Sequence, residues 1–200
     1  MPEPQYFAAP AGGAWDSTLL EPVAELNYEV LDALASTSGS LGGRWRALSE
    51  TARARLARCP FLLVDVGAAQ PQLWSNLPRL GVHEAQPVSV LLAQRGPLAT
   101  PLLRRVLLFA WHLARANRLA ARITLGMSAP CAVLVAACRF ADLEALAERR
   151  PAWIRPRWHD RPEVWQAWLG AAAEESPRGL ENLQLWGLQM LAADVLGRHA

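Results

Sequence analysis

Residues 125–158, LGMSAPCAVLVAACRFADLEALAERRPAWIRPRW, decide the fold that we expect for this chain. Gly126 can adopt the positive φ that ends a helix, and Ser128 can cap a short apolar helix that reaches about Cys138. A second short helix spans residues 141–150 and stops before Pro151, and a basic, tryptophan-rich segment follows it. The pattern predicts two helices packed like a helix–turn–helix unit, with arginines at their rim for a partner.

The residues before this stretch predict one long helix. Thr100 and Pro101 form a good N-cap and first-turn pair, and we expect the helix that they open to run to about Leu125. Cationic side chains gather on one of its faces: His112, Arg115, Arg118 and Arg122. This stripe is either a solvated face or a contact for phosphate or an acidic partner.

The residues after the stretch predict two more helices. Asp160 is positioned to cap a helix that contains Trp165 and Trp168. Ser176 and Pro177 repeat the cap-plus-proline signal and open a last helix to about residue 196.

The first hundred residues are less regular. Residues 1–16 are rich in Pro, Ala and Gly and are expected to be flexible, whereas residues 18–35 have helical periodicity. Residues 36–43, STSGSLGG, are expected to form a loop before a helix that starts at Trp45 and stops at Cys59. Residues 61–66 are a strand or a helical turn, and residues 88–93 a helix or a strand; periodicity leaves both open.

Together these signals predict an all-α, or predominantly helical, chain. A length of 200 residues suits one domain, with or without an appended subdomain. We expect a multi-helix orthogonal bundle with a flexible segment over 1–16. We also expect two further regions: an N-terminal helical region with Pro-rich connectors over 17–97, and a C-terminal helical region over 98–200.

Composition narrows the function classes. The net charge of +2 is too small to mark the whole chain as a nucleic-acid binder, although all 20 of its positive side chains are arginines. The three cysteines form no metal-binding pattern with the histidines, so we expect buried thiols, a reducing cytoplasm and no metal or other cofactor. No signal peptide and no membrane span is expected.

The chain is not expected to be an enzyme. None of its four histidines has an evident nucleophile or carboxylate at catalytic spacing, and no Gly-rich phosphate loop occurs.

The candidate functional residues therefore lie at the rim of the predicted helical pair. The helix after the turn, APCAVLVAAC, has no polar side chain to contact base edges and is expected to be buried. The candidate residues for binding DNA or a protein partner lie around it: Arg139, Arg149, Arg150, Arg155, Arg157, Trp158 and Arg161. Four of the nine tryptophans fall between residues 153 and 168, and they serve either a core or an interface.

About residues 103–170 resemble the FlhD family of flagellar transcriptional regulators. The matching features are Leu107–Leu108–Phe109–Ala110, Leu125–Gly126–Met127, Ala136–Ala137, Leu143 with Leu146–Ala147–Glu148, and Arg157–Trp158. The resemblance implies an all-α, dimer-forming regulator that binds promoter DNA with a second, zinc-carrying subunit, FlhC. Ile154 stands where the family commonly has a cysteine that links subunits, and the first hundred residues have no counterpart in the family.

Two hypotheses follow. The first is a cytoplasmic, FlhD-like regulator that acts as a homodimer, with an FlhC-like partner, at promoter DNA. The second is a protein-interaction or scaffold module, such as an accessory factor of a secretion or motility apparatus, that makes no contact with DNA. The pattern of residues 125–158 with its neighbouring arginines motivates the first, and high apolar content, nine tryptophans and near-neutral charge motivate the second as the alternative.

Overall fold

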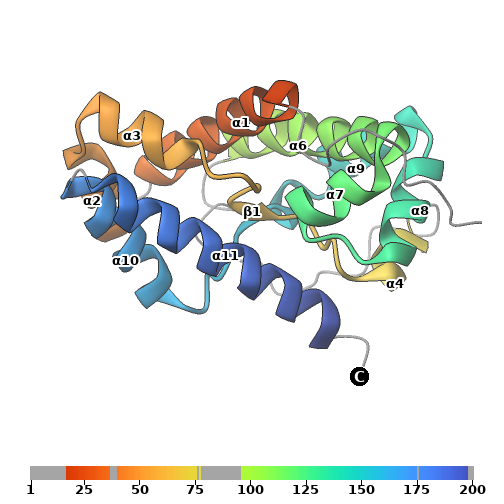
Figure 1. The fold of residues 1–200 in the computed structure, drawn as a ribbon. Coiled ribbons are helices and arrows are strands. Elements are labelled where there is room, and N and C mark those ends of the chain that lie inside the picture. The colour runs from red at the N-terminus through yellow and green to blue at the C-terminus, as the bar shows by residue number, and fades with distance from the viewer. Residues whose placement is uncertain (1–16, 37–39, 76, 78–95, 175, 198–200) are drawn as a thin grey trace, which may run out of the picture.

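The computed structural model describes residues 17–36, 40–75, 77, 96–174 and 176–197. Within them the chain is predominantly helical, as expected, with ten α-helices and one small two-stranded sheet (Figure 1). The expectations for residues 1–16 and 88–93 lie outside the described residues.

The N-terminal helices are α1 (Ser17–Ala35), α2 (Ser40–Ala47) and α3 (Glu50–Ala57). The expected loop over 36–43 is wrong in its second half, because α2 begins at Ser40. The expected single helix from Trp45 is also wrong. Ser49 has an extended backbone and its Oγ accepts a hydrogen bond from the Ala52 amide at 3.2 Å, so it ends one helix and caps the next.

The predicted helix from Thr100 to Leu125 is two helices. α6 (Gly96–Ala116) begins before Thr100, so that residue is no N-cap and Pro101 lies inside the helix. The helix is interrupted at Asn117, because its backbone is extended (φ −151°) and its Oδ1 accepts a hydrogen bond from the Ala120 amide at 3.0 Å. This cap opens α7 (Arg118–Leu125).

The Leu-Gly turn has the predicted caps. Gly126 ends α7 with φ +62°, and the Ser128 Oγ accepts from the Cys131 amide at 3.3 Å to open α8 (Ala129–Ala137). The chain bends by 114° between α7 and α8. α9 (Phe140–Arg149) follows and packs on α6.

The extended basic segment meets the short apolar run of the first half. After α9, a 3₁₀ turn (Pro151–Trp153) leads into β2 (Arg155–Pro156), which pairs antiparallel with β1 (Val64–Asp65). The run over 61–66 therefore contains a strand. α4 (Pro71–Ser75) follows β1 and packs against α8.

Two helices complete the chain, α10 (Pro162–Ala173) and α11 (Pro177–Gly197). The N-cap of α10 is Arg161 rather than the expected Asp160, and no side chain bonds to it. The last helix starts as predicted, with the Ser176 Oγ accepting from the Gly179 amide at 3.2 Å. α11 crosses the front of the molecule and packs against α10 and α7 (Figure 1).

A single hydrophobic core joins both halves of the chain. Phe61 packs against the rings of Trp158 and Trp168, with centroids 5.8 and 5.7 Å away. Gly187 lets α11 approach this cluster, because a Cβ there would overlap the Phe61 ring. Trp165 and Trp168 thus belong to the core, which is one of the two roles that the sequence allowed.

Candidate functional site

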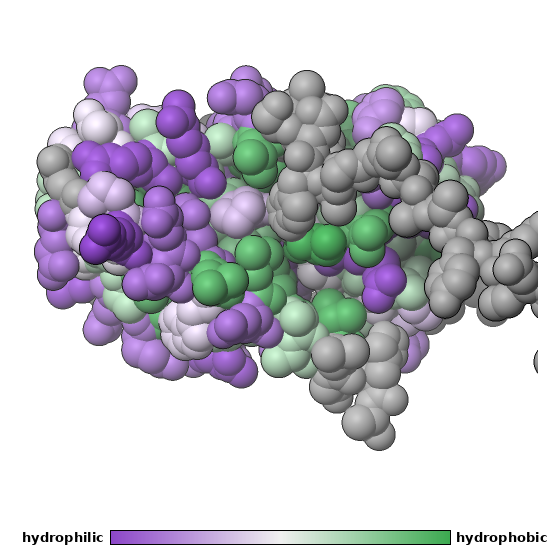
Figure 2. All heavy atoms as spheres, viewed as in Figure 1, coloured by the Kyte–Doolittle hydropathy of each residue, from purple (hydrophilic) through white to green (hydrophobic). Residues whose placement is uncertain are grey.

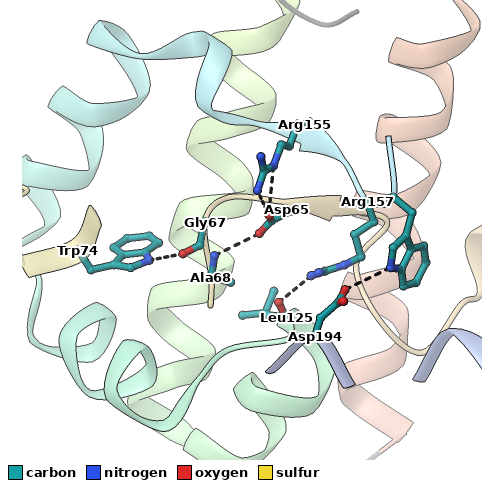
Figure 3. Close-up of polar contacts among 9 residues, drawn as sticks. Asp65, Gly67, Ala68, Trp74, Leu125, Arg155, Arg157 and Asp194 are labelled. Atoms are coloured by element: carbon teal, nitrogen blue, oxygen red, sulfur yellow. Dashed lines mark hydrogen bonds and ion pairs between the residues drawn. The ribbon is translucent and has the colours of Figure 1, made fainter. Parts of the chain in front are cut away.

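The segment from Arg155 to Arg161 forms the first of two candidate sites. Asp65 fixes the Arg155 side chain in this site. The Nε and Nη2 atoms of Arg155 donate to Asp65 Oδ2 at 3.2 and 2.7 Å across the small sheet (Figure 3). Burial works to raise the pKa of Asp65, but the charges of Arg157 and Arg155 outweigh it and hold that pKa below 3.8. Asp65 is therefore an anion at neutral pH.

Arg157 is buried rather than displayed to a partner, with 8% of its surface exposed. Its Nη2 donates to the Leu125 carbonyl (Figure 3), and its Nε donates to the Leu62 carbonyl, each at 2.6 Å. The Leu125 carbonyl lies at the C-terminus of α7, where the helix dipole favours a cation. Arg157 therefore ties the approach to β1 to the end of α7.

Trp158 is also buried, and it has φ +48°, which a bulky residue adopts only under constraint. Its ring packs on Phe61 and Trp168, and its Nε1 donates to Asp194 on α11 at 3.4 Å. These contacts hold the strained turn, and they place His159, Asp160 and Arg161 on its exposed side.

This turn borders a cavity of about 210 Å³. β1, β2, the end of α7 and α11 supply the remaining walls. The charged side chains in its lining are Asp65, Arg155, Arg157, Asp160, Arg161 and Asp194. The structure therefore brings together four of the seven predicted site residues, namely Arg155, Arg157, Trp158 and Arg161.

The other three predicted residues lie on or beside α9 and do not line this cavity. Arg139 is exposed and forms two hydrogen bonds of 2.9 Å with Asp142, one turn along. Arg149 is exposed near the end of α9, and Arg150 is half-buried just beyond it.

A second site lies where α6 meets the turn between α8 and α9. It includes His112 and Arg115 of the basic stripe that the sequence predicts, whereas Trp111 and Phe140 were not among the predicted site residues. Trp111 donates its Nε1 to the Cys138 carbonyl at 2.9 Å, and its ring lies 6.5 Å from that of Phe140. The Arg115 guanidinium lies 4.7 Å from the Trp111 ring centroid, a cation–π distance, and the His112 ring centroid lies 4.9 Å from it in an edge-on arrangement. We call Trp111, His112, Arg115 and Phe140 the aromatic–arginine cluster.

The helices that meet at the cluster, or continue from it, expose apolar side chains. Leu119 of α7, Val133 of α8 and Phe140 of α9 are about half exposed, at 52, 49 and 47%. The sequence has no acidic residue from 106 to 141, while it has four arginines there. Hydrophobic side chains also reach the surface on the face shown in Figure 2. The acid-free stretch was the signal in the sequence that could have pointed to this surface.

Several other chemistries find no support among the described residues. The three cysteines are free there, and burial raises the pKa of Cys138 to about 11. No three His, Cys, Asp or Glu side chains in this part of the chain are placed to hold a metal ion. No single described helix is long and apolar enough to cross a membrane, although the bent pair α7–α8 together has that length and composition.

No protein-family model, curated protein or solved structure matches the chain. The resemblance to the FlhD family therefore remains a prediction from the residues quoted above.

Proposed function

We propose that this protein is a non-enzymatic subunit of a transcription-regulating complex, and that it binds a protein partner through the aromatic–arginine cluster. The observation that carries the proposal is the exposed Phe140 beside the Arg115–Trp111 pair. Tryptophan, arginine and phenylalanine are the residues that protein interfaces favour at their centres. The partner is expected to present an apolar patch with acidic residues around it.

The same surface is poorly suited to reading DNA. α8 exposes Ala129, Pro130, Val133 and Ala137, none of which has a side-chain group that bonds to a base edge. Apolar side chains beside the arginines also gain little from phosphates, whereas they gain from burial against a protein. Promoter contact is therefore assigned to the complex, as in the FlhD resemblance, and not to this chain alone.

The turn geometry supports a helix–turn–helix-like role for α7 and α8. Three residues separate the helices, and the bend of 114° lies in the range of about 90–120° found in such units. In this chain the second helix presents apolar side chains, so the unit is proposed to support the partner surface.

The proposal is tested by partner capture followed by reconstitution. The partner is identified by pull-down from the native cell with the full chain and is then purified. Binding of the purified proteins is measured by calorimetry for wild type, Phe140→Ala and Arg115→Glu. We expect each substitution to weaken binding at least tenfold, because each removes a side chain from the centre of the interface.

Matched substitutions on another face serve as controls. Leu185→Ala removes an apolar side chain from α11 that is at least as exposed as Phe140, and Arg178→Glu reverses an exposed charge there. Both are expected to bind the partner like wild type. Salt-sensitive DNA binding should appear only when both proteins are present. The proposal fails if the α11 variants lose partner binding as strongly as the cluster variants, or if this chain alone binds DNA.

A further inference from the structure

The cavity beside the strained Trp158 turn is separate from the aromatic–arginine cluster and points to a different activity. We propose that it binds a small zwitterion of the α-amino-acid class and that the bound molecule fixes α11 against the 155–161 segment. Arg161 of this segment and Leu191 and Asp194 of α11 all line the cavity. A ligand inside it can therefore contact both elements.

The balance of charge in the lining selects this class of ligand. Three guanidiniums (Arg155, Arg157 and Arg161) face three carboxylates (Asp65, Asp160 and Asp194), so the formal charges cancel. A ligand with one net charge would meet as many repelling as attracting groups. A molecule with a carboxylate and an ammonium group can place each one beside its opposite.

Three of the charged side chains in the lining, Asp65, Arg155 and Arg157, already have hydrogen-bond partners. The charges of Arg161, Asp160 and Asp194 are therefore the ones that can bind a ligand. Asp65 and Arg155 bond to each other, and Arg157 bonds to two backbone carbonyls. Among the described residues, the contact of the Arg161 guanidinium is a distant one, 3.9 Å from Met190 Sδ. Asp194 accepts a long bond of 3.4 Å from Trp158. Arg161 would therefore bind the ligand carboxylate, and Asp194, with Asp160, the ammonium group.

Size and rigidity agree with a small ligand. A volume of about 210 Å³ corresponds to roughly seven water molecules in the liquid and lies below the range of about 300–1,000 Å³ for drug-sized ligands. The positive φ of Trp158 holds the 157–161 turn in a conformation that the chain would not otherwise prefer. Strained turns of this kind cluster at ligand sites.

The proposal is tested by thermal unfolding and calorimetry on the full chain. The probes are glycine, L-alanine, L-glutamine and L-leucine, with acetate and methylammonium as compounds that carry only one of the two charges. At a hundredfold excess over its Kd, an amino acid that binds should raise Tm by about 5 °C or more. Acetate and methylammonium should have no comparable effect, because each satisfies one side of the cavity only.

Substitutions locate the site. Arg161→Gln and Asp194→Asn should each weaken amino-acid binding at least tenfold, and Asn retains an oxygen that accepts from Trp158 Nε1. Arg149→Gln, an exposed position outside the cavity, is the matched control and should bind like wild type. Amide exchange in α11 should slow when the ligand binds.

Three results would overturn the proposal. The first is that none of the four amino acids shifts Tm at 10 mM, on the order of concentrations that saturate a millimolar site. The second is that acetate alone reproduces the shift, which would show a simple anion site. The third is that the shift survives both cavity substitutions. None of these results bears on partner binding, because the aromatic–arginine cluster does not line this cavity.

Discussion

Asn27 shows how much one buried amide can organise. Its Nδ2 donates to the carbonyls of Ala57, Cys59 and Phe61 at 2.9–3.3 Å, and its Oδ1 accepts from the Leu63 amide at 2.8 Å. The side chain is fully buried, so no water can replace these bonds. One residue of α1 thereby fixes the whole approach to β1.

We predict that Asn27→Leu lowers the free energy of unfolding by roughly 2–4 kcal/mol, because it leaves the Leu63 amide and the three carbonyls without this partner. Urea denaturation followed by circular dichroism measures the loss. Asn117→Ala is the control, since it removes an exposed helix cap at a cost of about 1 kcal/mol. Equal losses in the two variants would contradict the role assigned to Asn27.

Asp65 makes stability depend on pH. Its folded pKa lies below the value of 3.8, so its contribution is fully present above that value and is lost as pH falls through the folded pKa. We predict that Asp65→Asn costs about 2–3 kcal/mol at neutral pH, because Arg155 and Arg157 then lack their anion.

Urea unfolding between pH 3 and pH 7 measures that cost. The difference between wild type and Asp65→Asn should shrink as pH falls below about 4. Asn117→Ala, which removes no titratable group, is the control and should show no such trend. A difference for Asp65→Asn that stays constant over this range would contradict the assigned pKa.

Arg157 and Phe140 show why single residues resist assignment from sequence. Arg157 lies in a basic stretch and was predicted to face a partner, but its acceptors are carbonyls of residues 62 and 125. No local pattern indicates that such distant carbonyls converge. Phe140 was not predicted to be exposed, because its position depends on how α9 packs on α6.

Helix α7 ends at a glycine that no other residue can replace without strain. Gly126 has φ +62°, and a Cβ there would lie 2.8 Å from Leu191 and 3.2 Å from Arg157. Gly170, inside α10, has no atom within 4 Å of the position that a Cβ would take. The two glycines thus make a matched pair.

We predict opposite effects for the same substitution at these two positions. Gly126→Ala should lower the free energy of unfolding by about 2 kcal/mol or more, because the cost of a positive φ for alanine adds to the cost of the close contacts. Gly170→Ala should raise it by about 0.5–1 kcal/mol, since alanine loses less entropy in a helix. Thermal unfolding distinguishes these signs, and a stabilising Gly126→Ala would contradict the cap geometry.

Among the helices, boundaries set by strong local caps were predictable. Gly126, Ser128 and Ser176 act as the sequence indicated. Asn117 and Ser49 were missed because apolar periodicity continues past them, although both are good N-cap residues. The prediction of Asp160 as an N-cap was wrong. The chain turns at Trp158, whose ring packs in the core, and α10 begins only after Arg161.

The assembly of the molecule depends on pairings that sequence reasoning could not reach. Asp65 and Arg155 are register partners about ninety residues apart, and each strand has only two residues. Strands this short have no periodicity to detect. The predominantly helical class followed from local patterns, whereas the cavity follows from this long-range pairing.

The same pairings make the two halves interdependent. Asn27 bonds to residues 57–63, Arg157 returns to Leu62, and Phe61 lies between Trp158 and Trp168. We therefore predict a single cooperative transition in urea, with coincident midpoints for tryptophan fluorescence and far-ultraviolet circular dichroism. Asn117→Ala should shift both midpoints equally.

A fragment of residues 98–200 should lack fixed tertiary structure by near-ultraviolet circular dichroism, because Trp158 and Trp168 would lose Phe61 and expose apolar surface. Two separated transitions, or a folded fragment, would show that each half has a sufficient core of its own.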